Sequence, residues 1–264
     1  MIIFPNAKIN IGLNITSKRK DGYHNLESIF YPINWVDILE INKSDRFEFT
    51  SSGLHIDSNP DNNLVVKAYR LMVDKFKITP CQIHLHKQIP MGAGLGGGSA
   101  DASFTLTAIN QLFNLNISVF ELEKLADELG SDCPFFINNT PKLVNGKGNL
   151  ISKINLDLSD YYIKLVNPNI HVSTKEAFNG ITPKPSNTDY INFSVNDLTN
   201  SKITNDFEST VFSIHPILKD IKNTLETEGS FFTSMTGTGS TIFGLFKNKP
   251  KFTCEKYTEK IIKL

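Results

Sequence analysis

The sequence predicts an α+β protein in which strands and helices are mixed without a regular strand–helix–strand repeat. Three observations support this prediction: an alternating segment near the N-terminus, several stretches with helical spacing of apolar residues, and a glycine-rich loop that leads into one of them. With 264 residues the chain can form one large domain or two of ordinary size. We expect two lobes, residues 1–150 and 151–264, because the loop- and strand-like segment 142–159 separates two sets of elements.

The N-terminal region is predicted to be rich in strands. Residues 7–15 alternate between apolar side chains such as Ile9 and Ile11 and polar ones such as Lys8 and Asn10, which is typical of a half-buried strand. Further strands are predicted at residues 27–31, 37–41, 46–50, 82–86, 161–166 and 241–246.

Helices are predicted where apolar residues recur at helical spacing. Ser118 and Glu121 form a capping box for one helix, which should end at Gly130. The other helices are predicted over residues 64–76, 102–113, 217–225 and 254–264. Residues 179–196 are rich in Asn, Thr, Ser and Pro, which indicates an excursion over the surface.

The composition excludes several classes of protein. Lys and Arg number 27, as do Asp and Glu, so no overall field favours nucleic acid or an anionic membrane. The three cysteines, Cys81, Cys133 and Cys254, are odd in number and widely spaced, which argues against a disulfide framework or a metal cluster. No segment approaches eighteen consecutive apolar residues, and no leader pattern precedes Lys8. We therefore expect a cytoplasmic protein, either a monomer or a homodimer.

The most informative segment is the loop at residues 90–101, which has five glycines within seven positions. Glycine is expected in such density only where the backbone needs positive φ or a close approach by another group. Ala102, Leu106 and Ile109 follow at helical spacing, so the loop opens into a helix whose N-terminal amides favour a phosphate group. The segment is predicted to bind the phosphates of a nucleotide.

Other interpretations of this loop fit the sequence less well. The spacing of Gly92, Gly94 and Gly97 matches a dinucleotide fingerprint, but the acidic residues about twenty positions on fall inside a predicted helix. A Walker A loop requires a lysine after its last glycine, where this chain has Ser99. A flexible linker would not lie between a predicted strand and a well-patterned helix.

Three motifs in this order give the chain a resemblance to a known superfamily. They are Lys8 in the N-terminal strand, PMGAGLGGGSADA at residues 90–102, and MTGTGSTIFGLF at residues 235–246. The chain resembles the galactokinase, homoserine kinase, mevalonate kinase and phosphomevalonate kinase (GHMP) superfamily. The resemblance implies a two-lobed fold, with an N-terminal lobe like ribosomal protein S5 domain 2, and a smaller α+β C-terminal lobe that completes the substrate cleft.

Within the superfamily the chain is similar to the branch that acts on a methylerythritol carrying cytidine diphosphate. The similar segments are AKINIGLNITSKRKDGYHNLESIF at 7–30, LGSDCPFF at 129–136 and TNDFE at 204–208. The resemblance implies transfer of the γ-phosphoryl group of ATP to the 2-hydroxyl of methylerythritol, in the non-mevalonate route to isoprenoid precursors. Mg²⁺ is expected with ATP, but the sequence shows no clear ligand for it.

The resemblance also assigns roles to individual residues. It implies that Asp132 is the catalytic base and that Lys8 is its catalytic partner, since a nearby ammonium would keep the carboxylate ionised. Residues implied to bind the substrate are Asn10, Tyr23, His24, Phe30, Asp132, Thr174 and Phe178, with Tyr23 and Phe178 stacking on the cytosine ring. Residues implied to bind ATP are Asn63, Lys87, Pro90, Met91, Gly92, Ala93, Gly94, Leu95, Gly96, Gly97, Gly98 and Ser99.

Each assignment has a structural alternative. By position alone Asp132 is a turn or cap residue, Lys8 is a solvated lysine, and Phe178 is a core residue. The chain could also be another kinase of the superfamily, such as a homoserine or mevalonate kinase. A relative that binds a ligand without catalysis is the remaining alternative, because a fold does not by itself establish a function.

Overall fold

The computed structural model describes residues 1–56, 59–200, 203–253 and 256–264. The chain divides into two compact units that interleave along the sequence. The first unit comprises residues 1–7, 35–90 and 96–140, and the second comprises residues 8–34, 91–95 and 141–264. The domain boundary near residue 150 stays a prediction. In the described part of the chain, no helix is long and apolar enough to span a membrane.

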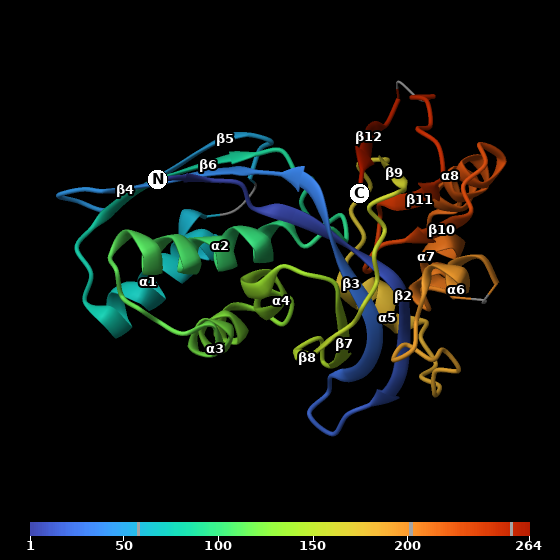
Figure 1. Cartoon of the computed structure of the whole chain (residues 1–264), viewed down its shortest axis with the longest axis horizontal. Coiled ribbons are helices and arrows are strands. Elements are labelled where there is room, and N and C mark those ends of the chain that lie inside the picture. The colour runs from blue at the N-terminus through green and yellow to red at the C-terminus, as the bar shows by residue number, and fades with distance from the viewer. Residues whose placement is uncertain (57–58, 201–202, 254–255) are drawn as a thin grey trace. The chain divides into compact units, whose positions relative to one another are not determined.

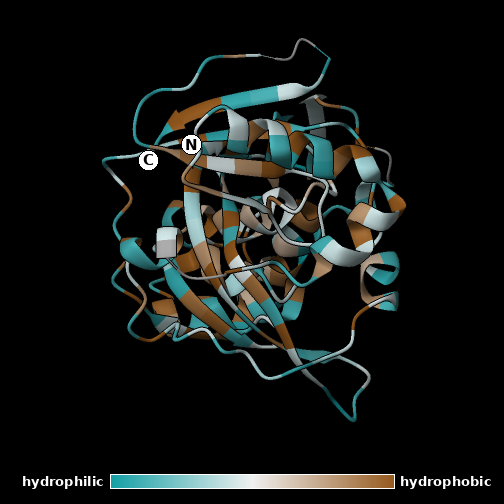
Figure 2. Cartoon of the chain, turned by 90° about the vertical axis from the view of Figure 1, so that its right-hand side faces the viewer, coloured by the Kyte–Doolittle hydropathy of each residue, from teal (hydrophilic) through white to brown (hydrophobic). Residues whose placement is uncertain are grey.

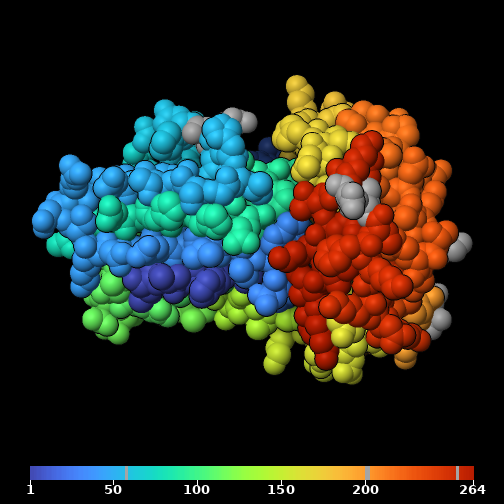
Figure 3. Space-filling model, turned by 90° about the horizontal axis from the view of Figure 1, so that it is seen from above, coloured from blue at the N-terminus to red at the C-terminus, as the bar shows by residue number. Residues whose placement is uncertain are grey.

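The first unit contains a four-stranded sheet with helices packed on one face (Figure 1). The strand order is β1-β4-β6-β5, and only the β5–β6 pair is parallel. Leu39, Ile41, Ile83 and Leu85 point to the covered face, where they join the core. The opposite face is open to solvent, as Figure 3 shows in blue to green. The strands are β1 (Ile2–Ile3), β4 (Ile38–Lys43), β5 (Glu48–Gly53) and β6 (Cys81–Lys87).

Two helices of the first unit, α1 and α3, begin and end where the sequence predicts, whereas α2 begins at Gly97, five residues before the predicted start, and η1 and α4 were not predicted. The first, α1, begins after Asn63, whose side chain accepts a hydrogen bond from the Val65 amide. The capping box of Ser118 and Glu121 is present at the start of α3, and Gly130 ends that helix. The helical elements are the 3₁₀ helix η1 (Pro60–Asn62), α1 (Leu64–Phe76), α2 (Gly97–Leu112), α3 (Val119–Leu129) and α4 (Cys133–Asn138).

The second unit contains two four-stranded sheets, with strand orders β2-β3-β7-β8 and β10-β11-β9-β12. The alternation of hydrophilic and hydrophobic residues along their strands is visible in Figure 2. The strands are β2 (Asn6–Lys18), β3 (His24–Val36), β7 (Lys142–Gly146), β8 (Leu150–Lys153), β9 (Tyr162–Asn167), β10 (Phe232–Met235), β11 (Ile242–Phe246) and β12 (Thr258–Lys263). The helices are α5 (Thr174–Asn179), α6 (Val195–Asn200), α7 (Phe207–Ile214) and α8 (Pro216–Thr227).

The predicted C-terminal helix is wrong, because residues 258–263 form strand β12. The strand pairs antiparallel with β9 along its whole length, from Thr258 opposite Asn167 to Lys263 opposite Tyr162. A short apolar run fits either a helix or a strand, and here the free edge of β9 decides for the strand. The first residues of the predicted helix, 254–255, lie outside the described residues.

The segment 179–196 is mainly irregular, as predicted, but it is anchored to the second unit. Tyr190 is buried, and its hydroxyl donates a hydrogen bond of 2.7 Å to the side-chain oxygen of Asn14 on β2. A side chain at Gly12 would collide with the Tyr190 hydroxyl. The excursion therefore packs against the strand that carries Lys8.

Candidate active site

Lys8 and Asn10 lie side by side on β2 in the second unit and are both buried. The Lys8 ammonium donates a hydrogen bond to the Asn10 side-chain oxygen and lies 4.4 Å from the centre of the Phe30 ring. The Asn10 amide donates to the Ser28 hydroxyl at 2.9 Å. Since Lys8 is only 3% exposed, the alternative of a solvated lysine is wrong. The structure thus brings together three of the predicted site residues, Lys8, Asn10 and Phe30.

The MTGTGSTIFGLF motif at residues 235–246 contacts this cluster through Thr236. The Thr236 hydroxyl accepts a hydrogen bond from the Asn10 backbone amide at 3.1 Å and donates one to the Gly94 carbonyl oxygen at 2.9 Å. The Gly237 amide donates to the Asn10 side-chain oxygen at 3.0 Å. The N-terminal strand, residues 91–95 of the glycine loop and the C-terminal loop therefore share one hydrogen-bond network within the second unit.

The TNDFE segment fixes the C-terminal loop and the N-terminal strand. The Asn205 amide donates to the carbonyl oxygens of Met235 and Gly237, at 2.8 and 2.7 Å. The Asp206 carboxylate accepts from the Ile15 amide, and the Glu208 carboxylate accepts from the Met235 amide, both at 2.8 Å. No role was predicted from the sequence for Asn205, Asp206 and Glu208, or for Thr236 and Ser28. The TNDFE motif was the signal in the sequence that could have identified Asn205, Asp206 and Glu208.

The glycines of the loop serve different purposes. Gly94 has a φ of +76°, and a Cβ there would overlap the Thr236 carbonyl oxygen. A Cβ at Gly97 would lie 2.9 Å from a methyl carbon of Ile89 and 3.0 Å from the Lys87 ammonium. A Cβ at Gly98 would meet only Leu64, at an ordinary 3.8 Å. Packing therefore requires glycine at residues 94 and 97, whereas Gly98 leaves open space for a ligand.

Helix α2 begins directly from the loop, as predicted. Gly96 is its N-cap residue, with a φ of +70°, and Gly97, Gly98 and Ser99 form its first turn. The amides of a helix's first turn have no partner within the helix, and the helix dipole makes this end attractive to anions. Gly98 is exposed in this first turn, a position that suits a phosphate group at a helix N-terminus.

Asp132 is the N-cap residue of α4 in the first unit, but its side chain makes no capping hydrogen bond to that helix. The helix is held at this end by Ser103 of α2, whose hydroxyl donates to the Cys133 carbonyl oxygen at 2.7 Å and to that of Ser99 at 3.0 Å. Ser103 thereby links the backbone next to Asp132 to the first turn of α2. The Asp132 residue is half-buried.

The aromatic residues expected to bind the substrate lie in the second unit. The His24 ring, and not the Tyr23 ring, stacks on Phe178, with the ring centres 4.8 Å apart. Tyr23 is 59% exposed, while Phe178 also packs edge-on against Phe207. Burial lowers the pKa of His24, and Lys18 lowers it further, so the imidazole is neutral at pH 7. A neutral imidazole can both donate and accept a hydrogen bond.

Of three other predicted residues, Asn63 and Lys87 have clear structural partners. Thr174 is the first residue of α5, which starts with a capping box formed by Ser173 and Glu176. Asn63 caps α1, and Lys87 at the end of β6 is buried between two carboxylates. Among the described residues, no group of three or more His, Cys, Asp or Glu is placed to hold a metal ion.

The fold and motifs match known proteins. Family models for the N-terminal and C-terminal domains of GHMP kinases match residues 63–139 and 194–259. The solved structure of a 4-(cytidine 5'-diphospho)-2C-methyl-D-erythritol kinase is similar, with a TM-score of 0.77, 27% identity, and coverage of 93% of this chain and 90% of that chain. A homoserine kinase from Cytophaga hutchinsonii shares the fold at 19% identity, with a TM-score of 0.65 and coverage of 92% and 85%. The class of protein is therefore a GHMP kinase, for which ATP is the co-substrate.

Proteins with similar sequences identify the family within this class. A 4-diphosphocytidyl-2-C-methyl-D-erythritol kinase from Parabacteroides distasonis is 48% identical over 255 residues, which cover 96% of this chain and 94% of the relative. One of the same name from Bacteroides fragilis is 47% identical over 260 residues, with coverage of 96% and 94%. The chain belongs to the 4-diphosphocytidyl-2-C-methyl-D-erythritol kinase family within the GHMP kinases.

Proposed function

We propose that the protein transfers the γ-phosphoryl group of ATP to the 2-hydroxyl of 4-diphosphocytidyl-2-C-methyl-D-erythritol, giving the 2-phosphate and ADP. The observation that carries this proposal is the 48% identity, over 96% of the chain, to a relative named for that substrate. The buried cluster of Lys8, Asn10 and Phe30 supports it, because a desolvated ammonium suits a reaction in which phosphoryl charge is rearranged.

The proposed chemistry needs few groups. Phosphoryl transfer depends mainly on positioning and on charge stabilisation, with one group to accept the hydroxyl proton. Asp132 is the proposed base, and the Lys8 ammonium is proposed to stabilise negative charge on the reacting groups. The phosphates of ATP are proposed to bind at the first turn of α2, where Gly98 leaves room for them.

Mg²⁺ is proposed to accompany ATP, because in kinase sites it is held by substrate phosphates together with one or two carboxylates. Among the residues that the structure describes, no group of three or more His, Cys, Asp or Glu could hold a metal ion, so this part of the chain offers no dedicated cage. No step of the mechanism proposed here depends on a particular ligand of the metal.

The cytidine moiety is proposed to bind at Tyr23, His24 and Phe178. The stacked pair of His24 and Phe178 presents an aromatic surface with a hydrogen-bonding edge, and the exposed Tyr23 ring offers a second flat face. Thr174, at the start of the helix that carries Phe178, is proposed to contact the same substrate.

The reaction is proposed to take place in the cytoplasm with a small-molecule substrate. The described cysteines, Cys81 and Cys133, are free, and burial raises the pKa of their thiols to about 11 and about 12. They therefore stay protonated and unreactive at neutral pH.

A substrate comparison tests the proposed function. ADP release should be measured with 4-diphosphocytidyl-2-C-methyl-D-erythritol, homoserine, mevalonate and galactose at equal concentrations. We expect turnover with the cytidylated substrate alone. Turnover with homoserine or mevalonate would support another GHMP kinase, and ATP binding without any turnover would support a relative that has lost catalysis.

Replacement of Gly98 by Ala tests the phosphate position. The new Cβ fits the protein, and alanine favours the helix, so the melting temperature should stay the same or rise. The KM for ATP should rise by about 10- to 150-fold if the methyl group prevents one charge-assisted hydrogen bond to a phosphate. Gly97→Ala serves as the contrast, because it should destabilise the fold by collision with Ile89. An unchanged KM for ATP in Gly98→Ala would exclude this position for the phosphates.

Replacement of Tyr23 by Ala tests the cytidine site. The KM for the cytidylated substrate should rise by about 5- to 150-fold, since stacking on a base contributes roughly 1 to 3 kcal/mol. The KM for ATP should stay constant, and Tyr23→Phe should retain most of the affinity. Phe120→Ala is the matched control, because Phe120 is a similarly exposed aromatic residue, at 63%, on α3. Equal losses for both substrates would show that Tyr23 is structural.

A further inference from the structure

A buried ion-paired cluster lies at the end of β6 in the first unit. The Lys87 ammonium is 2.8 Å from a carboxylate oxygen of Asp101 on α2 and also pairs with Asp37, which precedes β4. All three side chains are at most 3% exposed. The ammonium is therefore engaged inside the protein and not presented to solvent.

The cluster contacts the chain on both sides of the glycine loop. Before the loop, the second oxygen of Asp37 accepts hydrogen bonds from the backbone amides of Gln88 and Ile89, the latter at 2.8 Å. After the loop, Asp101 belongs to the second turn of α2, and Gly97 packs so closely on the Lys87 ammonium that a Cβ would lie 3.0 Å from it. Three charged side chains thus connect the residues that enter the loop with the helix that leaves it.

Burying the three charges of the cluster costs free energy, which indicates that these residues do more than fill space. Buried ion pairs are often no more stabilising than well-packed apolar residues of similar volume. One oxygen of Asp101 has no hydrogen-bond partner in the described part of the chain. Burial raises the pKa of Asp101 to about 7, although the Lys87 ammonium opposes that rise. Apolar residues would hold β6 against α2 without the cost of burying charges. They would not fix the orientation of α2 relative to β6, because apolar contacts are not directional as hydrogen bonds are.

We propose that Lys87, Asp37 and Asp101 are positioning residues for ATP, which hold the two ends of the glycine loop so that the first-turn amides of α2 meet the phosphates. This inference rests on the proposed function, because it takes the nucleotide phosphates to bind at α2. Lys87 then acts on ATP through α2, while its own ammonium stays between the two carboxylates.

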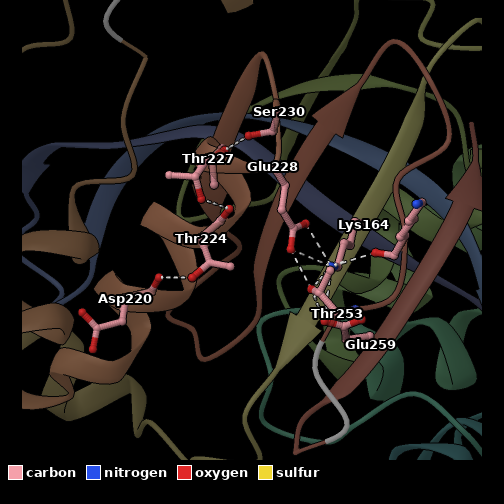
Figure 4. Close-up of polar contacts among 10 residues, drawn as sticks. Lys164, Asp220, Thr224, Thr227, Glu228, Ser230, Thr253 and Glu259 are labelled. Carbon is pink, nitrogen blue, oxygen red and sulfur yellow. Dashed lines mark hydrogen bonds and ion pairs between the residues drawn. The ribbon is translucent and has the colours of Figure 1, made fainter.

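The second unit offers a matched control in Lys164 on β9. Its side chain is fully buried and its ammonium lies 3.0 Å from Glu228 and 3.3 Å from Glu259, with a further hydrogen bond of 2.7 Å to Thr253 (Figure 4). This cluster joins β9 and β12 to the end of α8, and none of its members belongs to the proposed site. Both lysines therefore lie between two carboxylates, and only Lys87 is connected to the loop.

The experiment compares Lys87→Met with Lys164→Met in the full-length protein. Both variants should lose stability, measured as melting temperature, because each leaves buried carboxylates without their cation. Only Lys87→Met should raise the KM for ATP, by about 10- to 100-fold for a displacement of the amides on the order of 1 Å, with the KM for the cytidylated substrate unchanged. Binding of a non-hydrolysable ATP analogue, measured by calorimetry, should weaken to the same degree.

Asp101→Asn provides a second variant that keeps the shape of the side chain and leaves Lys87 paired with Asp37. It should remain folded and show a smaller rise in the KM for ATP alone, and it decides the question if Lys87→Met does not fold. An unchanged KM for ATP in folded Asp101→Asn, or equal rises in Lys87→Met and Lys164→Met, would overturn the positioning role. Failure of the wild-type protein to bind the ATP analogue would instead overturn the proposed function.

Discussion

The Asp132→Asn variant should remain folded and lose about 10² to 10⁴-fold in kcat, the range typical of general-base assistance. Asparagine keeps the size and most of the hydrogen bonding of aspartate but has no negative charge and cannot accept the hydroxyl proton. The KM values for both substrates should change little, because the proposed role of the carboxylate is in proton transfer and not in uniform binding of the ground state.

The structure explains why this variant should fold. The Asp132 side chain makes no capping hydrogen bond to α4, and the start of that helix is held by the Ser103 hydroxyl and the buried Cys133. Turnover should be measured by coupled ADP release and stability by thermal unfolding. Asp157→Asn is the control, because Asp157 is an exposed residue whose carboxylate accepts a hydrogen bond from the nearby Ser159 amide. Turnover near the wild-type level in folded Asp132→Asn would contradict a base at this position.

Elements whose signals are local could be predicted from the sequence. The alternation of residues 7–15 predicted β2, and the box of Ser118 and Glu121 predicted the start of α3 to the residue. The strands expected at 82–86 and 161–166 are β6 and β9, with ends shifted by one residue. These signals depend on side-chain periodicity and on backbone capping, which neighbouring residues alone determine.

Features that depend on distant partners could not be predicted in this way. Strand β12 was mistaken for a helix because its pairing partner, β9, lies about ninety residues earlier in the chain. The stacking of His24 on Phe178 was not predicted, because the two rings come from segments about 150 residues apart in the chain. Local sequence gives no information about which of two adjacent rings faces a helix 150 residues away.

The glycine loop shows the same division between local and distant causes. The density of glycine predicted a ligand, and all five residues were interpreted as making room for phosphates. The structure separates Gly94, which accommodates the Thr236 carbonyl oxygen, and Gly97, which accommodates Lys87 and Ile89, from Gly98, which faces open space. Two of these glycines are required by protein packing, so substitution at residue 94 tests the fold before it tests ATP binding.

Replacement of Lys8 by Met should remove most turnover, by about 10² to 10⁴-fold in kcat, if its ammonium acts in the same step as Asp132. Methionine preserves an unbranched apolar chain against the Phe30 ring, which the lysine now covers. The Asn10 side-chain oxygen keeps its hydrogen bond from the Gly237 amide at 3.0 Å, so the loss of Lys8 leaves no orphaned acceptor there. The variant should therefore stay folded, with a melting temperature close to that of the wild type.

The double variant Lys8→Met with Asp132→Asn tests whether the two residues act as a unit. A proton acceptor and the cation that supports it are strongly non-additive, so the double variant should be scarcely slower than the slower single variant. Independent roles predict instead that the two losses in kcat multiply. The pair Lys8→Met with Asp157→Asn is the control, in which the effects should be additive because Asp157 has no role in the proposed site. If the losses in kcat multiply in Lys8→Met with Asp132→Asn, then Lys8 stabilises phosphoryl charge independently of the base.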